Sequence, residues 1–244
     1  MRCLLSLLAC LSLLSGCAST PKDPSGIWIN QAAIDAAVQN NHLREALLAY
    51  GPNLEWNLDS PRQQATFSNG FELADGQLSA QADGLWQVDF HGESHELLKP
   101  QGKLLIQQAS ATWPEQRFSH PEIKLEANAP VGSSFEYSLY QAFLAGTWKI
   151  RSGPGEGGLV EFHADGRLDG LPGAERFALC LAGDCAAMSG EYDSLWLQLG
   201  QEGNEWIFVR DGDQLQIFAA LNRAQPDEMP ELHPGPQRWL LERD

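Results

Sequence analysis

Carboxylates alternate with imidazoles in the segment 89–96, which is the part of the sequence best suited to hold a metal ion. Side chains two residues apart share one face of a continuous strand, so such a strand would present together Asp89, His91, Glu93 and His95. This mixed donor set can bind a divalent cation. Gly92 and Ser94 favour instead a solvated turn between two strands. We prefer the turn, and we assign no metal ligand and no cofactor to the chain.

The sequence contains none of the patterns that mark common catalytic sites. It has no G-x-S-x-G elbow, no H-E-x-x-H pair and no phosphate-binding P-loop. The glycine-rich segment 153–158 lacks the lysine and the following helix of a phosphate site, so we interpret it as a loop. Asp211 and Asp213 fall in a predicted hairpin turn, where the backbone favours aspartate. We therefore predict that the protein is not an enzyme.

The N-terminus is typical of an exported protein. Arg2 precedes an apolar run of eleven residues, Leu4–Leu14. The run is too short to cross a bilayer, which needs about 20 residues, and it fits the apolar region of a secretory signal peptide. It ends in Leu14-Ser15-Gly16-Cys17, which resembles the lipobox of bacterial lipoproteins. The alternative is an ordinary secretory signal with a chance cysteine.

The lipobox resemblance implies a processed and anchored chain. Residues 1–16 would be removed as a signal peptide, and Cys17 would carry the lipid, with palmitate among its acyl chains. Several acyl chains together anchor a protein stably. Residues 17–25 would form the lipidated tether. Ala18, where an inner-membrane lipoprotein has Asp, implies sorting to the outer membrane of a diderm bacterium.

The lipobox also accounts for the odd number of cysteines, which is five. Cys3 and Cys10 would leave with the signal peptide and Cys17 would be lipidated, so Cys180 and Cys185 remain. We expect these two to flank the loop of a hairpin, at a separation that suits a disulfide, and an oxidising envelope compartment permits the bond. The alternative is a metal-binding or redox pair, although two cysteines without further ligands make a poor metal site.

The charge of the chain argues against one class of partner. There are 16 Lys and Arg residues against 32 Asp and Glu, which gives a formal net charge of −16. A nucleic-acid-binding surface needs clustered cations, and so does adhesion to anionic lipids through a polybasic patch. We therefore expect no nucleic acid partner, and we expect membrane contact to come from the lipid anchor.

Alternating apolar and polar residues predict an all-β chain with a small helical insertion. Helices are predicted at 31–39 and 42–50, which form the insertion 31–50, and at 135–144. The stretch 110–132 contains three prolines and is interpreted as the end of the first unit plus a linker. The predicted strands are 54–59, 64–68, 70–73, 77–81, 85–90, 96–99, 103–109, 147–150, 158–163, 167–169, 176–181, 186–189, 194–199, 205–210, 214–221 and 238–242.

Two patterns occur twice, in the same order. Gly26-Ile27-Trp28 corresponds to Gly146-Thr147-Trp148, and Ala74-Asp75-Gly76 corresponds to Ala164-Asp165-Gly166. This order favours an internal duplication, in which the helical insertion lengthens the first copy. The alternative is that Asp-Gly hairpins simply recur, as they do in many β proteins.

A G-x-W strand followed by a meander of hairpins resembles the calycin superfamily, which includes the lipocalins. The second unit is also similar to the META and HslJ domains. In these families the tryptophan closes one end of a small barrel, and a basic residue of the last strand packs over it. The resemblance therefore implies structural barrel-end roles for Trp28 and Trp148, with Arg238 or Arg243 over Trp148 in a cation–π contact.

Together these features predict a non-enzymatic, lipid-anchored envelope protein whose units 26–130 and 131–244 form two tandem antiparallel β-barrels. An eight-stranded barrel is either filled by side chains or holds one small ligand, so we expect binding of a small apolar ligand or of an envelope protein. The alternative is an inhibitor or assembly factor that contacts a basic envelope or host protein through acidic loops. The loop 225–237 would then make the contact, with Asp227, Glu228 and Glu231.

Overall fold

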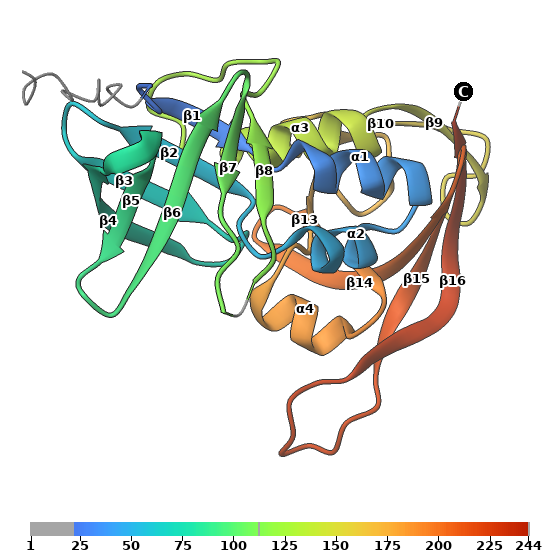
Figure 1. The fold of residues 1–244 in the computed structure, drawn as a ribbon. Helices are drawn as coiled ribbons and strands as arrows, with labels where there is room; N and C mark the ends of the chain where they lie inside the picture. Colours follow the sequence, from blue (N-terminus) through green and yellow to red (C-terminus); the bar gives the residue numbers. More distant parts are fainter. Residues whose placement is uncertain (1–21, 112, 244) are drawn as a thin grey trace, which may run out of the picture.

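A computed structural model describes residues 22–111 and 113–243. These residues form two antiparallel β-barrels with a few short helices (Figure 1). The predicted fold class, all-β with a small helical insertion and two tandem barrels, is confirmed. The lipobox and Cys17 lie outside the described residues.

The first barrel is closed, and its eight strands pair in chain order. Closure is completed where Ile29 of the first strand pairs with Ser119 of the last. A short 3₁₀ turn, η1 (Ala82–Gly84), precedes the fifth strand. The strands are β1 (Gly26–Ile29), β2 (Glu55–Asp59), β3 (Gln64–Ser68), β4 (Leu73–Ala80), β5 (Trp86–Phe90), β6 (Ser94–Gln101), β7 (Leu104–Gln107) and β8 (Gln116–Ser119).

The insertion predicted at 31–50 is present as α1 (Gln31–Asn40) and α2 (Leu43–Tyr50). The side chain of Asn30 accepts a hydrogen bond from the backbone N–H of Ala33 and so caps α1. Within the described residues, no helix is long and apolar enough to cross a membrane.

The second barrel is an eight-stranded antiparallel sheet whose two edge strands nearly meet. The backbone N–H of Leu168 donates to the carbonyl of Glu175 at 2.8 Å, and the N–H of Phe177 donates to the carbonyl of Gly166 at 2.9 Å. In sheet order the strands are β11 (Leu168–Asp169), β10 (Leu159–Phe162), β9 (Gly146–Ser152), β16 (Leu232–Arg243), β15 (Gln214–Asn222), β14 (Glu202–Asp211), β13 (Asp193–Leu199) and β12 (Arg176–Leu179).

Two further helices accompany this barrel, α3 (Ser133–Phe143) and α4 (Gly183–Ser189). The strand predicted at 186–189 was wrong, because these residues belong to α4. Ala186 and Ala187 have high helix propensity, and this preference replaces the predicted hairpin.

Strand β8 lies inside the stretch 110–132, which was predicted to be irregular. Pro114 and Pro121 flank the strand rather than interrupt it. Gln116 and Phe118 alternate with exposed or half-buried neighbours, as the inward residues of a strand should. The closing strand of the first barrel was therefore missed because prolines nearby masked a short alternating run.

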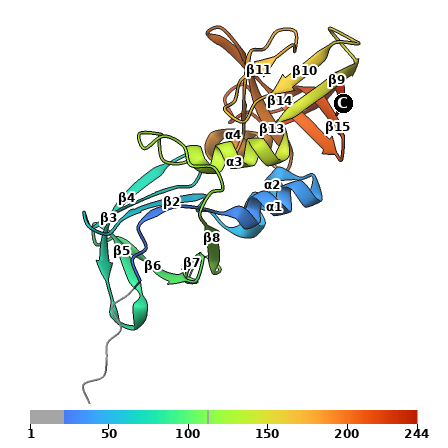
Figure 2. The same ribbon diagram turned by 90° about the horizontal axis from the view of Figure 1, so that it is seen from above.

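Helices α1, α2 and α3 lie between the two barrels, as both views show (Figures 1 and 2). Ile34 and Leu47 of the insertion belong to the same buried cluster as Phe143 and Trp148 of the second unit. A separate buried cluster fills the first barrel. The insertion that leaves the first barrel therefore completes the core of the second.

Two buried carboxylates cap helices across this junction. Asp193 of β13 accepts hydrogen bonds from the backbone N–H groups of Leu43 (2.9 Å) and Arg44 (2.6 Å), at the start of α2. Glu55 of β2 accepts one from the N–H of Phe135 (2.9 Å), at the start of α3. The residues that precede these helices, His42 and Gly132, make no side-chain cap. Each barrel therefore supplies the cap that the other unit's helix lacks.

Candidate functional site

The interiors of both barrels are filled by large side chains. A side chain beside a cavity that admits water keeps some accessible area, whereas Trp56 in the first barrel and Trp148 in the second are 0% exposed. The first interior also holds Leu58, Ala65, Leu78, Val88, Leu98, Leu105 and Phe118. The second also holds Ile150, Val160, Phe162, Leu195, Leu197, Leu215, Ile217 and Leu241. An eight-stranded barrel is either filled by side chains or holds one small ligand. Both described interiors are filled by side chains.

The two G-x-W tryptophans have matching environments. The indole N–H of Trp28 donates to the carbonyl of Pro24 (2.8 Å), and that of Trp148 donates to the carbonyl of Leu144 (2.9 Å). In both cases the acceptor lies four residues earlier. Gly26 and Gly146 have φ angles of +128° and +123°, a region that favours glycine. The two copies therefore share the geometry of the whole G-x-W segment.

The basic residue over Trp148 is Arg243, whose guanidinium carbon lies 4.6 Å from the ring centroid. Of the two arginines predicted for this barrel-end role, Arg238 was wrong, because it lies 5.5 Å from the ring of Trp239 instead. The strand register explains the difference, since Arg243 pairs directly with Trp148 across β16 and β9. Arg243 also donates to the carbonyl of Ala145 at 3.1 Å.

In the first barrel the corresponding place is taken by His120, directly after β8. Its ring stacks on Trp28 with centroids 3.7 Å apart, and its Nδ1 lies 2.7 Å from the carbonyl oxygen of Ile27. His120 was not predicted, because the expected partner of the tryptophan was an arginine. His120 directly follows the alternating residues of β8, and this position could have indicated its role.

Cys180 and Cys185 form a disulfide, with Cα atoms 5.9 Å apart. The bond was predicted, but the hairpin expected to carry it is not present. Cys180 follows β12 and Cys185 lies in the first turn of α4, so the bond fixes the helix to the end of the strand. Leu181 and Gly183, between the two cysteines, lie against Gly70 and Phe71 of the first barrel. The disulfide loop is therefore part of the contact between the barrels.

Within the segment 89–96, residues 91–93 form a turn between β5 and β6. The N–H of Glu93 donates to the carbonyl of Phe90, and the N–H of Gly92 donates to the carboxylate of Asp89. His91 has a φ of 58°, which breaks the strand that a one-faced donor set would need. Among the described residues, no group of three or more His, Cys, Asp or Glu could hold a metal ion.

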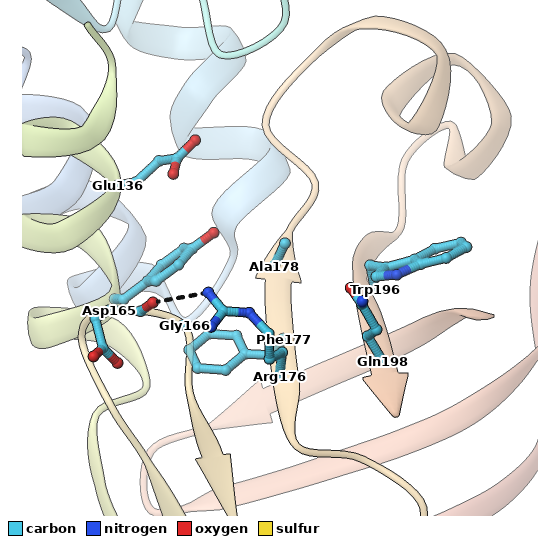
Figure 3. Close-up of a pocket in the computed structure, with 9 residues that line it drawn as sticks. Glu136, Asp165, Gly166, Arg176, Phe177, Ala178, Trp196 and Gln198 are labelled. Carbon is cyan, nitrogen blue, oxygen red and sulfur yellow. Dashed lines mark hydrogen bonds between the residues drawn. The ribbon is translucent and has the colours of Figure 1, made fainter. Parts of the chain in front are cut away.

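A shallow cleft of about 180 Å³ lies where α3 crosses the gap between β11 and β12 (Figure 3). Arg176 lies near its centre and donates to the carbonyl of Asp165 at 3.5 Å. The hydroxyl of Tyr140 accepts from the N–H of Leu179 at 3.2 Å, and its ring lies 4.9 Å from that of Phe177. Tyr140 therefore seals the seam of the second barrel. The other lining residues are Glu136, Gly166, Ala178, Trp196 and Gln198.

The chemistry of the cleft suits structure better than catalysis. Burial raises the pKa of Tyr140, so its hydroxyl stays protonated. Desolvation and the nearby carboxylate of Glu55 raise the pKa of Glu136. The lining residues include no serine, cysteine or histidine, and the volume is below the roughly 300–1,000 Å³ of ordinary ligand pockets. The cleft therefore offers neither a nucleophile with its base nor room for a typical ligand.

A more prominent feature is the hairpin end at 220–234, which we call the acidic arm. It projects from the lower side of the second barrel in Figure 1. The pairing of β15 with β16 shifts register on both sides of Phe218, and such bulges bend and re-aim a hairpin. The ring of Tyr192 packs edge-on against that of His233, with centroids 5.7 Å apart, at the base of the arm.

The turn of the acidic arm is held by its own hydrogen bonds. The side-chain oxygen of Asn222 accepts from the N–H groups of Ala224 (2.9 Å) and Glu231 (3.0 Å). The N–H of Arg223 donates to the carbonyl of Glu231 at 2.9 Å. The tip presents Asp227 and Glu228 beside Met229, which is 60% exposed, whereas the carboxylate of Glu231 lies 2.9 Å from Nε2 of His233 at the base of the arm. The arm is therefore a structured projection with an apolar residue in an acidic rim.

Comparisons of the chain with family models, with curated proteins and with solved structures found no match.

Proposed function

We propose that the protein is a lipid-anchored binding protein of the bacterial envelope that contacts a basic protein through the acidic arm. The shape and composition of the arm carry this proposal. It projects beyond the barrel, its turn is fixed by hydrogen bonds, and it places an exposed methionine next to the exposed residues Asp227 and Glu228. An apolar anchor with a charged rim is a common arrangement in protein interfaces.

The alternative of an apolar ligand inside a barrel has less support. Fully buried aromatic and aliphatic side chains occupy both interiors, so a ligand would have to displace well-packed core groups. Forcing extra groups into a packed core typically costs about 1–3 kcal/mol. A surface contact requires no such change, and the proposal includes no catalytic step.

The acidic arm would act in two ways. The arm carries three carboxylates, those of Asp227, Glu228 and Glu231, and one arginine, Arg223. The carboxylate of Glu231 lies 2.9 Å from Nε2 of His233, and the arm stays acidic within a chain whose net charge is −16. A negative surface speeds encounter with a basic partner, and the rate falls with salt. The fixed turn reduces the ordering cost of binding. An inhibitor or an assembly factor for a basic envelope or host protein would use this arrangement.

Site-specific photo-crosslinking in the native envelope tests the proposal. A photoreactive residue replaces Met229 at the arm tip, and a matched control replaces Leu199, which is also exposed but lies in β13. We expect position 229, and not position 199, to crosslink to a basic protein. Affinity for that purified protein should fall at least tenfold when Asp227, Glu228 and Glu231 become Asn, Gln and Gln, which corresponds to about 1.4 kcal/mol. Equal affinity of the neutralised variant would overturn the proposal.

A further inference from the structure

The first described residues are fixed to one end of the first barrel. The Nζ of Lys22 donates to the carbonyl of Gly102 at 2.8 Å, and the indole N–H of Trp86 donates to the carbonyl of Lys22 at 3.0 Å. The hydroxyl of Ser60 donates to the carboxylate of Asp23 at 2.6 Å. These bonds gather three hairpin turns around the lead segment 22–25.

We call this region the outer end, defined by the lead segment 22–25 and the turns 60–63, 81–85 and 102–103. The strands of the first barrel run antiparallel in chain order, so these turns share one end of the barrel. The insertion helices and the turn at Phe71 lie at the opposite end, against the second barrel. The outer end is therefore the part of the first barrel farthest along its axis from the second barrel.

The outer end lies close to the predicted lipid. Five residue steps separate Cys17 from Lys22, and an extended chain spans at most about 3.6 Å per residue, or roughly 18 Å in all. The headgroup layer of one leaflet is itself roughly 5–7 Å thick. Since Lys22 is hydrogen-bonded to the barrel, the residues after Lys22 cannot lengthen the tether.

The charge of the outer end differs from that of the chain. Its cations are Lys22, Arg62 and Lys103, and its carboxylates are Asp23 and Asp83. Asp59 borders the region and forms an ion pair with Arg62 at 3.3 Å. The region is therefore near neutral, whereas the chain has twice as many acidic as basic residues. Leu104, 37% exposed, adjoins the turn 102–103. A neutral end suffers little repulsion from an anionic leaflet.

We infer that the outer end lies against the phospholipid headgroups of the leaflet that holds the acyl chains of Cys17. The inference rests on the lipid anchor of the proposed function. It fixes the orientation of the whole molecule, because the two barrels share a packed junction. In Figure 1 the chain enters at the upper left, while the acidic arm projects from the lower side of the second barrel. The arm therefore extends away from the bilayer toward a partner in the aqueous space.

Energy transfer to labelled lipids tests the orientation in the full lipidated chain. A donor dye is attached at Lys103→Cys on the outer end or at Asp227→Cys on the arm, and both positions are exposed. The vesicles contain phosphatidylethanolamine and phosphatidylglycerol with acceptor dye on a fraction of the headgroups. We expect stronger transfer from position 103 than from position 227. Equal transfer, or stronger transfer from position 227, would overturn the inference.

A tether variant separates the orientation from the anchor. A 20-residue Gly-Ser insertion between Thr20 and Pro21 adds a root-mean-square span of about 25 Å, so flotation with vesicles should persist while the difference in transfer shrinks. If the difference does not change, the short tether is not its cause and the inference fails. If the native chain does not float with vesicles, the anchor fails as well. Affinity of the acidic arm for its partner, measured without vesicles, is independent of both results.

Discussion

The two barrels begin with a similar G-x-W segment, but they close in different ways. Each begins with a G-x-W strand whose tryptophan donates to a carbonyl four residues earlier. The first barrel closes through its own strands, where Ile29 pairs with Ser119. The second leaves a seam between β11 and β12 that Tyr140 of α3 seals, and its core includes helices of the first unit. The same starting segment therefore supports a self-sufficient barrel and a dependent one.

The second barrel depends on the helices for part of its stability. A barrel without full closure leaves unpaired strand edges, and short strands such as β11 offer little pairing. Helices α1, α2 and α3 compensate by adding apolar residues to the core of this barrel, and Tyr140 of α3 bonds across the seam. We therefore expect the two barrels to unfold together, even though only the first is complete by itself.

The largest expected effect is from Trp148→Ala. Removing a fully buried tryptophan leaves a cavity and costs about 3–5 kcal/mol, and Trp148 is 0% exposed. Urea unfolding followed by circular dichroism should show one transition that shifts as a whole. Trp196→Ala is the matched control, because Trp196 is 44% exposed and its loss should cost far less. A second transition that stays in place would show that the first barrel unfolds independently.

A smaller effect is expected from Asp193→Ala, which removes the cap that the second barrel gives to α2. Loss of a helix cap costs about 0.5–2 kcal/mol. Glu191→Ala is the control, since Glu191 is exposed and lies two residues away. Chemical denaturation of both variants measures the difference. If both variants lower the unfolding free energy by the same amount, the cap at Asp193 does not stabilise the contact between the barrels.

Neither cap could be predicted from the sequence, because each depends on two residues far apart in the chain. Leu43 and Asp193 are 150 positions apart, and Glu55 and Phe135 are 80 apart. The insertion and most strands were predictable because alternation and helical periodicity are local, whereas β8 and α4 were not. The repeated Asp-Gly pair was misleading, since Gly76 pairs with Ala65 inside β4 whereas Gly166 lies in a turn beside β11. The predicted loop 225–237 covers the tip of the acidic arm, but its second half was wrong, because residues 232–237 belong to β16. The projection of the arm depends on a register shift that no local pattern encodes.

The buried caps also predict a pH dependence. Burial raises the pKa of Asp193 above its ordinary value of 3.8 and that of Glu55 above 4.5. A raised pKa in the folded state means that the stabilising contribution is complete below the ordinary value and is lost as pH rises through the folded value. The unfolding free energy should therefore fall as the pH rises from about 4 toward neutrality.

Glu55→Gln tests that window, because the amide keeps a hydrogen-bond acceptor and does not ionise. Unfolding free energies measured by urea titration at several pH values should show a shallower decline for the variant than for the wild type. Glu122→Gln, at a residue in the exposed stretch after β8, is the control and should leave the decline unchanged. An unchanged decline in Glu55→Gln would mean that this carboxylate is not the group responsible.

The residues over the two tryptophans can be exchanged, and the smallest effect is expected from His120→Arg. Arg243→His removes a cation–π contact worth about 0.5–2 kcal/mol and the hydrogen bond to Ala145. His120→Arg places the residue of the second barrel over Trp28, where the histidine ring now stacks at 3.7 Å. Because an arginine can also stack on the indole and reach the carbonyl of Ile27, the cost should stay within about 1 kcal/mol. Chemical denaturation of the two single variants and of the double variant gives the change in unfolding free energy for each. If His120→Arg proves as costly as Trp28→Ala, the two barrel ends are not interchangeable, and the likeness of the two G-x-W segments stops at the tryptophan.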